Sequence, residues 1–229
     1  MWILVSGLFI LLALICPHWW RKITVKRWQL AHGLDKHQPV FTKLYADIDG
    51  FSLSRIARSQ HDAIDYTYGE IDFLSFIALL SLAKPNHQTV FYDLGSGTGK
   101  AVLACAMVFN VQRSYGIELF ESLNNAACTR QKVLRFLPEY AAISKTIHFI
   151  QGDFLHVDFN DATLVFINAT GFIGQTWTEI SARLTQTTRC TTVISTSKSL
   201  KSDAFTITNV TAVRMSWGVV KAYIQKRTR

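Results

Sequence analysis

The chain has few charged residues, few prolines and no closely paired cysteines, and each shortage excludes a class of protein. Only 17% of its 229 residues are charged and 49% are hydrophobic, which excludes intrinsic disorder. Four prolines and twelve glycines, without a repeat, exclude collagen-like and low-complexity chains. The length fits one compact domain of about 150 to 200 residues with a short appendage.

The cysteines are scattered through the sequence. Cys16, Cys105, Cys128 and Cys190 form no Cys-x-x-Cys pair, and no histidine stands at ligand spacing from them. This pattern predicts free thiols in a reducing compartment, and it excludes a disulfide framework and a zinc site. We therefore expect no metal in this protein.

The positive charge of the chain lies at its two ends. The formal net charge is +8, from 24 basic and 16 acidic residues. Most of the excess lies in residues 1–40 and 221–229, because residues 41–220 carry 15 basic and 15 acidic residues. A protein that follows a phosphate backbone needs a basic face on its folded body. The neutral body therefore makes binding to DNA or to a nucleosome doubtful.

An apolar segment begins the chain and indicates a membrane anchor. Residues 2–15 are almost wholly apolar, and no charged residue comes before Arg21. Trp19 and Trp20 then precede a basic stretch, which is the order in which a transmembrane helix meets the lipid headgroups. We therefore expect one transmembrane helix over residues 1–20, with the membrane as a partner.

A cleaved signal peptide is the alternative for this segment. Signal peptides carry basic residues before the apolar run and small residues at the cleavage site. Here the basic residues follow the run, and Ile15 stands where a small residue is needed. By the positive-inside rule the basic flank stays in the cytoplasm, so the folded domain should face the cytoplasm. A basic juxtamembrane segment with lead-in helices is expected over 21–60, and the folded domain over 61–229.

The rest of the chain alternates strand-like and helix-like segments. Buried strands are expected at 89–94, 114–119, 146–151, 163–168 and 190–197. Apolar residues at helical spacing predict helices at 71–84, 100–109, 121–137 and 177–184. Two further strand-like segments, 204–217 and 219–225, are separated by Gly218. The pattern predicts an α/β fold: a Rossmann-like, mostly parallel seven-stranded sheet with helices on both faces and an antiparallel C-terminal hairpin.

A glycine-rich segment, Asp93-Leu-Gly-Ser-Gly-Thr-Gly-Lys100, lies between an expected strand and an expected helix. Alternate glycines let a backbone turn sharply and approach a ligand. A dinucleotide fingerprint would need glycine at Lys100, and a phosphate-binding P-loop needs a different spacing before its Gly-Lys. The remaining pattern, an acid followed by G-x-G-x-G, resembles class I methyltransferases that use S-adenosyl-L-methionine.

Carboxylates follow three successive strands, which suits this cofactor. S-adenosyl-L-methionine carries a sulfonium and an ammonium group, so Asp93 would attract it where a pyrophosphate would be repelled. Glu118 ends the next strand and suits the ribose hydroxyls. Asp153 follows the third strand and suits the adenine amino group, with Phe154 stacking on the ring.

Three further segments narrow the resemblance. They are Tyr68-Gly-Glu before the sheet, Asn168-x-x-x-Phe after the fourth strand, and Ser216-Trp before the last strand. With the glycine loop they resemble the disruptor-of-telomeric-silencing family, the histone-lysine methyltransferases that lack a SET domain. This resemblance implies transfer of a methyl group to the side-chain amine of a protein that presents a lysine.

The resemblance also implies roles for individual residues. Those expected to bind the cofactor are Tyr68, Gly69, Glu70, Ile71, the stretch from Phe91 to Lys100 (within it Asp93, Gly95, Ser96, Gly97, Thr98 and Gly99), Glu118, Asp153, Phe154 and Asn168. The catalytic residues implied are Asn168, as a carbonyl acceptor that orients the amine or the cofactor, and Phe172 and Trp217, as walls of the lysine channel. The structural alternatives are a core position for either aromatic residue and a turn cap for Asn168.

The sequence departs from the family pattern at two positions. Lys100 stands where the family often has glutamine, and Ala169 stands where a second asparagine is usual. Two alternatives for the function stay open. One is a methyltransferase acting on a small molecule or a lipid-linked metabolite, and the other is a module that binds the cofactor without turnover.

Overall fold

The computed structural model describes residues 20, 22–59 and 62–228 and divides the chain into two units, Met1–Val40 and Phe41–Arg229. In the first unit, residues 22–31 are helical, and α2 (Leu34–Leu44) begins. Apart from Trp20, the expected transmembrane segment 1–20 lies outside the described residues. Within the described ranges, no helix is both long and apolar enough to cross a membrane.

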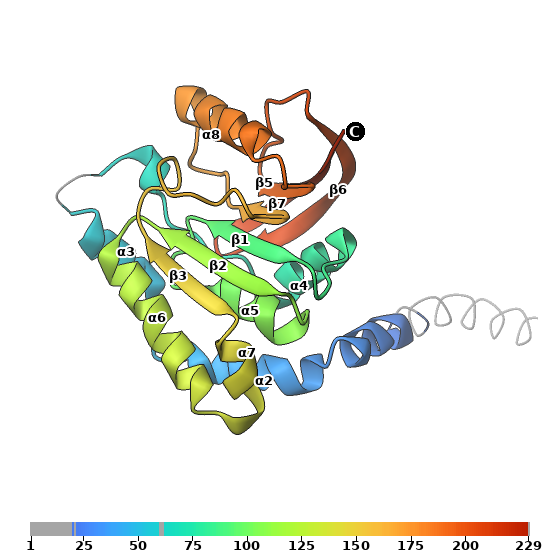
Figure 1. Ribbon diagram of the computed structural model, residues 1–229. Helices are drawn as coiled ribbons and strands as arrows, with labels where there is room; N and C mark the ends of the chain where they lie inside the picture. Colours follow the sequence, from blue (N-terminus) through green and yellow to red (C-terminus); the bar gives the residue numbers. More distant parts are fainter. Residues whose placement is uncertain (1–19, 21, 60–61, 229) are drawn as a thin grey trace, which may run out of the picture. The chain divides into compact units, whose positions relative to one another are not determined.

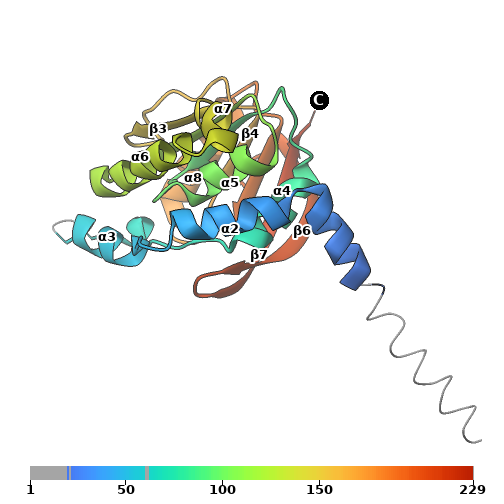
Figure 2. The same ribbon diagram turned by 90° about the horizontal axis from the view of Figure 1, so that it is seen from below.

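The second unit contains a seven-stranded sheet in the order β3-β2-β1-β4-β5-β7-β6 (Figure 1). Its parallel strands are β1 (Val90–Leu94), β2 (Arg113–Glu118), β3 (Ile147–Gln151), β4 (Leu164–Ile167) and β5 (Thr192–Thr196). The antiparallel hairpin of β6 (Phe205–Met215) and β7 (Gly218–Arg227) closes one edge (Figure 2). The predicted sheet and hairpin are confirmed, with strand ends correct to within about two residues.

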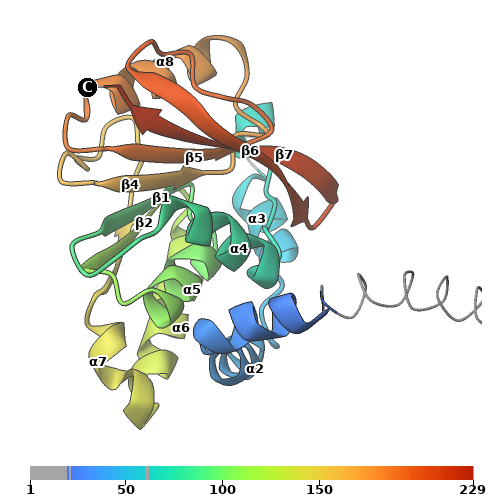
Figure 3. The ribbon, with the colours of Figure 1, turned by 90° about the vertical axis from the view of Figure 1, so that its right-hand side faces the viewer.

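Helices cover both faces of this sheet (Figure 3). The helices on one face are α4 (Phe73–Ala83), α5 (Lys100–Val108) and α6 (Glu121–Arg135), and α8 (Gly174–Gln186) lies on the other. Shorter elements are α3 (Gly50–Ala57), α7 (Ala141–Ser144) and two 3-10 turns, Ile64–Tyr66 and Pro138–Tyr140. Alternate residues of β1 serve the two faces: Phe91 contacts Phe76 of α4, whereas Tyr92 belongs to the core under α8.

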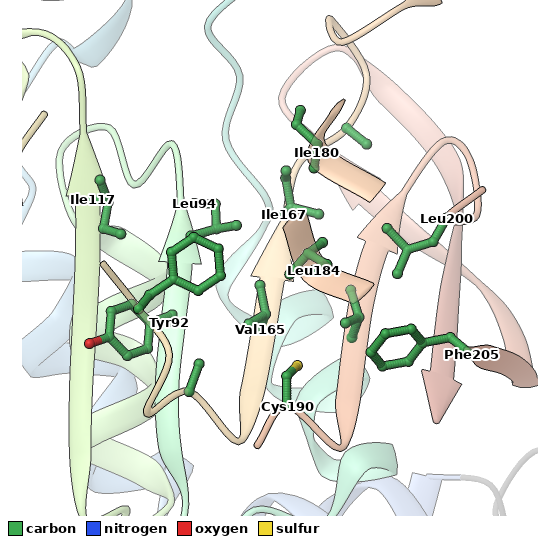
Figure 4. Close-up of a cluster of buried hydrophobic side chains, with 14 of the residues drawn as sticks. Tyr92, Leu94, Ile117, Val165, Ile167, Ile180, Leu184, Cys190, Leu200 and Phe205 are labelled. Carbon is green, nitrogen blue, oxygen red and sulfur yellow. The ribbon is translucent and has the colours of Figure 1, made fainter. Parts of the chain in front are cut away.

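A core of buried hydrophobic side chains lies between the sheet and α8 (Figure 4). It includes residues of β1 and β4, the neighbouring strands at which the strand order reverses. Val165 and Ile167 of β4 pack with Ile180 and Leu184 of α8, and all four are at most 1% exposed. Burying each such side chain contributes about 1.5–3 kcal/mol. This buried core therefore stabilises the central strands, whose carboxyl ends can then position a binding site.

Candidate functional site

A cavity of about 290 Å³ lies at the carboxyl ends of the central parallel strands. Strand β1 is flanked by β2 on one side and β4 on the other, so the strand order reverses at β1 and opens a crevice there. The predicted residues that line the cavity are Tyr68, Gly69, Glu70, Ile71, Asp93, Gly95, Ser96, Gly97, Thr98, Lys100, Glu118, Asp153, Phe154, Asn168 and Phe172. Leu94, from the same predicted stretch, also lines the cavity, whereas four predicted residues, Phe91, Tyr92, Gly99 and Trp217, are not among the lining residues.

The glycine loop needs its glycines for different reasons. Gly95 and Gly97 have φ angles of 81° and 54°, in the left-handed region that favours glycine. A Cβ on Gly97 would lie 2.8 Å from the ring of Tyr68. Gly99, the N-cap residue just before α5, also has a φ angle of 81°, and a Cβ there would lie 2.5 Å from the ring of Phe149. Gly99 therefore supports the loop from behind rather than lining the cavity.

Asp93 presents a buried carboxylate to the cavity. It is 4% exposed, and within the described part of the chain no donor makes a hydrogen bond to it. Burial raises the pKa of the Asp93 carboxyl well above its usual value, and the negative charge of the neighbouring Glu118 adds a smaller effect in the same direction. A buried, unpaired carboxylate is costly unless a ligand supplies its partner. This site therefore fits a ligand with a cationic group.

Glu118 orders the glycine loop. Its Oε2 accepts a hydrogen bond from Gly97 N at 2.7 Å, and its Oε1 accepts one from Phe120 N at 3.0 Å. Burial raises the pKa of Glu118, although these two bonds lower it. Each carboxylate oxygen keeps capacity for a second donor, such as a hydroxyl. Asp93 and Glu118 together thus suit a nucleoside that carries a positive charge.

The segment around Glu70 is tied to the glycine loop and to the end of β6. Lys100 Nζ donates to Glu70 Oε2 at 2.6 Å, and the Tyr68 hydroxyl donates to Glu70 Oε1 at 2.7 Å. Ser216 N donates to Glu70 O at 2.8 Å, and Glu70 N donates to Ser216 Oγ at 3.1 Å. The Tyr-Gly-Glu and Ser-Trp segments of the sequence therefore meet at the cavity.

The aromatic residues expected to wall a lysine channel lie in two different places. Phe172 packs edge-on against Phe154, with ring centroids 5.5 Å apart, so it belongs to the wall expected to hold adenine. Trp217 is 44% exposed, and its ring lies over Gly69, where a Cβ would be 1.6 Å from Trp217 Cζ3. Met215, from the same strand end, lines the cavity instead.

Asn168 lies just after β4, with its side chain in hydrogen bonds. Its Nδ2 donates to Gly69 O at 3.4 Å. Its Oδ1 accepts from Thr196 Oγ1 at 2.7 Å and from Thr170 Oγ1 at 3.0 Å. The carbonyl expected to orient the amine is thus already occupied by two hydroxyl groups of the protein.

The expectation that Phe91 and Tyr92 bind the cofactor is wrong, because both side chains are buried in the core instead of lining the cavity. Phe91 contacts Phe76 of α4, and Tyr92 belongs to the core under α8. Asp153 accepts a hydrogen bond from Leu155 N at 2.8 Å through Oδ1, which holds the turn after β3.

Within the described ranges, no group of His, Cys, Asp and Glu could hold a metal ion.

Sequence reasoning missed several lining residues, including Ser54, Asp65, Phe120, Thr176 and Glu179. Phe120 follows the acid that ends β2, so a search of strand ends could have found it. The others come from α3, a 3-10 turn and α8, which are far apart in the sequence, and no pattern marks them. Asp65 Oδ2 accepts from Thr176 Oγ1 at 2.9 Å, which joins two of these elements at the cavity.

The chain matches one described family and several named relatives. The family described as "Histone methylation protein DOT1" matches residues 56–221. A Caenorhabditis elegans protein named "Histone-lysine N-methyltransferase, H3 lysine-79 specific" is 32% identical over 148 residues, which is 62% of this chain and 16% of that protein. A Saccharolobus islandicus "Protein-lysine N-methyltransferase" is 28% identical over 88 residues, which is 38% of this chain and 50% of that protein. The chain thus spans half or less of the length of these two relatives.

Two solved structures are similar in fold. An RNA methyltransferase from Salinibacter ruber in complex with S-adenosyl-L-homocysteine aligns with a TM-score of 0.50 and 21% identity, covering 67% of this chain and 91% of that one. A putative RNA methyltransferase from Pyrococcus horikoshii aligns with a TM-score of 0.54 and 12% identity, covering 79% of this chain and 96% of that one. At these identities the likeness shows the fold alone, which is the Rossmann-like fold expected from the sequence.

Proposed function

We propose that this chain, which belongs to the DOT1 histone-methylation family, is an S-adenosyl-L-methionine-dependent methyltransferase that acts on the side-chain amine of a protein lysine. The observation that carries the proposal is the buried, unpaired carboxylate of Asp93 beside a glycine loop at the reversal of strand order. The family match supports it, because residues 56–221 contain the glycine loop, the three strand-end acids and Asn168.

Different residues of the cavity would bind different parts of the cofactor. When bound, S-adenosyl-L-methionine would supply a methyl group on a positively charged sulfur atom: a neutral amine would attack the methyl carbon in line as the carbon–sulfur bond breaks, so that S-adenosyl-L-homocysteine leaves with the electron pair and the methylated amine gives its proton to water. Asp93 stabilises the cationic part of the cofactor by charge, and Glu118 binds its hydroxyl groups. Asp153 would accept from the adenine amino group, while Phe154 and Phe172, which pack edge-on against each other, would hold the ring. Tyr68, Gly69, Glu70 and Ile71 cover the loop and exclude water.

The charge of the cavity favours a basic acceptor. Among its described lining residues, Lys100 carries the one full positive charge, whereas Asp65 and Glu179, which hold no part of the cofactor in this proposal, are acidic. Acidic groups attract a lysine ammonium to the entrance. Apolar lining residues such as Met215 then remove water from the amine and lower its pKa, which favours the neutral nucleophile.

The substrate class follows from the relatives and from the charge of the body. Relatives of this chain are named protein-lysine or histone-lysine methyltransferases. Residues 41–220 carry equal numbers of basic and acidic residues, so the folded body offers no net charge to DNA. We therefore propose a protein lysine outside the nucleosome as the acceptor.

A methyl-transfer assay tests this proposal. The full chain is incubated with tritium-labelled S-adenosyl-L-methionine and fractionated lysate, and methylated lysine is identified by mass spectrometry. We expect a labelled protein with wild type and none with Asn168→Ala, which should lose turnover. Label confined to small molecules or lipids would favour the alternative acceptor. Calorimetric binding without transfer to any fraction would favour a module that holds the cofactor.

The membrane anchor is a second proposal, supported by the sequence. The apolar run, its closing tryptophans and the basic residues from Arg21 onward support a single span over residues 1–20 with the catalytic domain facing the cytoplasm. Carbonate extraction of the full chain, compared with a chain that starts at residue 22, tests it. We expect the full chain in the membrane pellet and the shortened chain in the supernatant. Equal release of both would overturn the proposal.

A further inference from the structure

The side chain of Asn168 belongs to a row of polar groups behind the cavity. Its Oδ1 accepts from Thr196 Oγ1 at 2.7 Å and from Thr170 Oγ1 at 3.0 Å. Thr170 Oγ1 in turn lies 2.7 Å from Ser197 Oγ. The Nδ2 of Asn168 donates to the carbonyl oxygen of Gly69 at 3.4 Å. Residues from the end of β5 thus contact, through Asn168, the segment that covers the glycine loop.

The direction of each hydrogen bond in this row follows from counting protons. Gly69 O can only accept, so the amide of Asn168 must turn its NH2 group toward Gly69 and its oxygen toward the hydroxyls. Thr170 has one hydroxyl proton and gives it to Asn168, so Ser197 must donate to Thr170. Both acceptor positions of Asn168 Oδ1 are therefore filled by Thr170 and Thr196.

The backbone at the end of β5 is held in an uncommon conformation that points into this row. Ser197 has a φ angle of 67°, a left-handed conformation that is uncommon for a residue with a side chain. Ser197 N donates to Lys221 O at 2.7 Å, which holds the turn in place. Next to it, Lys198 Nζ donates to the carbonyl oxygen of Phe172. Strain of this kind persists where the surrounding structure enforces it, and it is concentrated at functional sites.

We propose that Thr196, Thr170 and Ser197 are positioning residues that fix Asn168 as a hydrogen-bond donor. One Nδ2 hydrogen binds Gly69 O and holds the Tyr68–Ile71 segment, and the other stays available to an acceptor on the bound cofactor. With its oxygen filled, Asn168 does not accept a hydrogen bond from the incoming amine. This inference rests on the proposed methyl transfer, because the row matters to the reaction only if Asn168 serves it.

Three substitutions on β5 separate positioning from packing. Thr196→Val keeps the shape of the side chain and removes its donor, whereas Thr196→Ser keeps the hydroxyl. Thr192→Val is the matched control, because Thr192 is a buried threonine at the opposite end of the same strand. The first measurement is kcat and KM for the protein substrate that the labelling assay identifies. The others are the calorimetric affinity for S-adenosyl-L-homocysteine and the NMR signals of the Asn168 side-chain amide.

The expected results depend on whether the side chain at position 196 keeps its hydroxyl group. Thr196→Val should lower kcat about tenfold, since one lost hydrogen bond is worth that much, with little change in KM for the protein substrate. Its Asn168 amide signals should broaden or shift, whereas Thr196→Ser and Thr192→Val should resemble wild type in every measurement.

The possible failures are distinguishable. If Thr196→Val matches Thr192→Val in kcat and in the amide signals, the positioning proposal is overturned. If wild type transfers no methyl group, the proposed function fails, while the amide signals still show whether the hydroxyls orient Asn168. Should circular dichroism show that Thr196→Val does not fold, Thr170→Val takes its place with the same expectation, because it removes the other donor.

Discussion

Lys100 Nζ lies 2.6 Å from Glu70 Oε2, and this ion pair joins the glycine loop to the segment that crosses it. The side chains are 24% and 18% exposed, so water screens the pair only in part. Lys100 Nζ also lies 5.3 Å from the centre of the Tyr45 ring, and the Tyr45 hydroxyl donates to Thr98 O at 3.1 Å. The family that this sequence resembles often has a neutral glutamine at the position of Lys100. In this chain, Lys100 instead forms an ion pair with Glu70 beside the glycine loop.

Removing one partner of this pair should weaken cofactor binding. Lys100→Met leaves Glu70 without its cation in a partly buried position, and we expect roughly tenfold weaker calorimetric affinity for the cofactor. The double variant Lys100→Met with Glu70→Gln removes both charges and should recover most of that loss. Lys145→Met, at an exposed lysine outside the cavity, is the control. A double variant as weak as the single one would show that the pair does not act as a unit.

Asp93 should limit the stability of the cofactor-free protein at neutral pH. Its pKa is raised on folding, so the folded state gains stability from protonated Asp93 below the unfolded pKa of about 4. That contribution is lost as pH rises toward the raised pKa. Asp93→Asn removes the buried charge, and it should raise Tm at neutral pH by about 2–4 °C for each kcal/mol regained. It should have little effect near the unfolded pKa.

The same variant should lose the cofactor. Calorimetry is expected to show no measurable affinity of Asp93→Asn for S-adenosyl-L-methionine, because the cation loses its carboxylate partner. Thermal melts at the two pH values give the stability part. An unchanged affinity, or a lower Tm at neutral pH, would contradict the role given to this carboxylate.

Cofactor binding should release a proton from Asp93. A bound cation favours the ionised carboxylate and lowers a pKa that burial had raised. The apparent binding enthalpy of wild type should therefore depend on the ionisation enthalpy of the buffer at a pH between the free and bound pKa values. Glu118 is the other buried acid whose pKa is raised, so Glu118→Gln shows how much of the effect it carries. Identical enthalpies in all buffers would mean that Asp93 is already ionised in the free protein.

Gly69→Ala should displace the indole of Trp217. The added Cβ would lie 1.6 Å from Trp217 Cζ3, a distance that no packing tolerates. Because Gly69 also accepts from Asn168, we expect weaker cofactor binding and a shift in tryptophan fluorescence. The double variant Gly69→Ala with Trp217→Ala restores the space and should regain part of the affinity. If the single variant binds as well as wild type, Trp217 has no part in holding this segment.

The strand–helix alternation could be predicted because each element carries its pattern within a few neighbouring residues. The buried strand Val90–Leu94 is continuously apolar up to Asp93, and Gly99 marks the start of the next helix. The first turn of α8, by contrast, lay outside the expected helix 177–184, because Gly174 to Thr176 carry no apolar residue at helical spacing. Helix α3 was expected only in outline, as part of the lead-in region.

The amino-acid sequence alone determined the sheet, the three acids at its strand ends and the family. These features depend on side-chain period, on glycine backbone angles and on the rule that parallel strands end at the same edge. Only the tertiary structure decided that Phe172 joins Phe154, that Trp217 covers Gly69 and that Thr196 occupies the carbonyl of Asn168. Asn168 and Thr196 are 28 positions apart, and Glu70 and Ser216 are 146 apart. Contacts over such separations depend on how whole elements pack, and no local pattern in the chain encodes them.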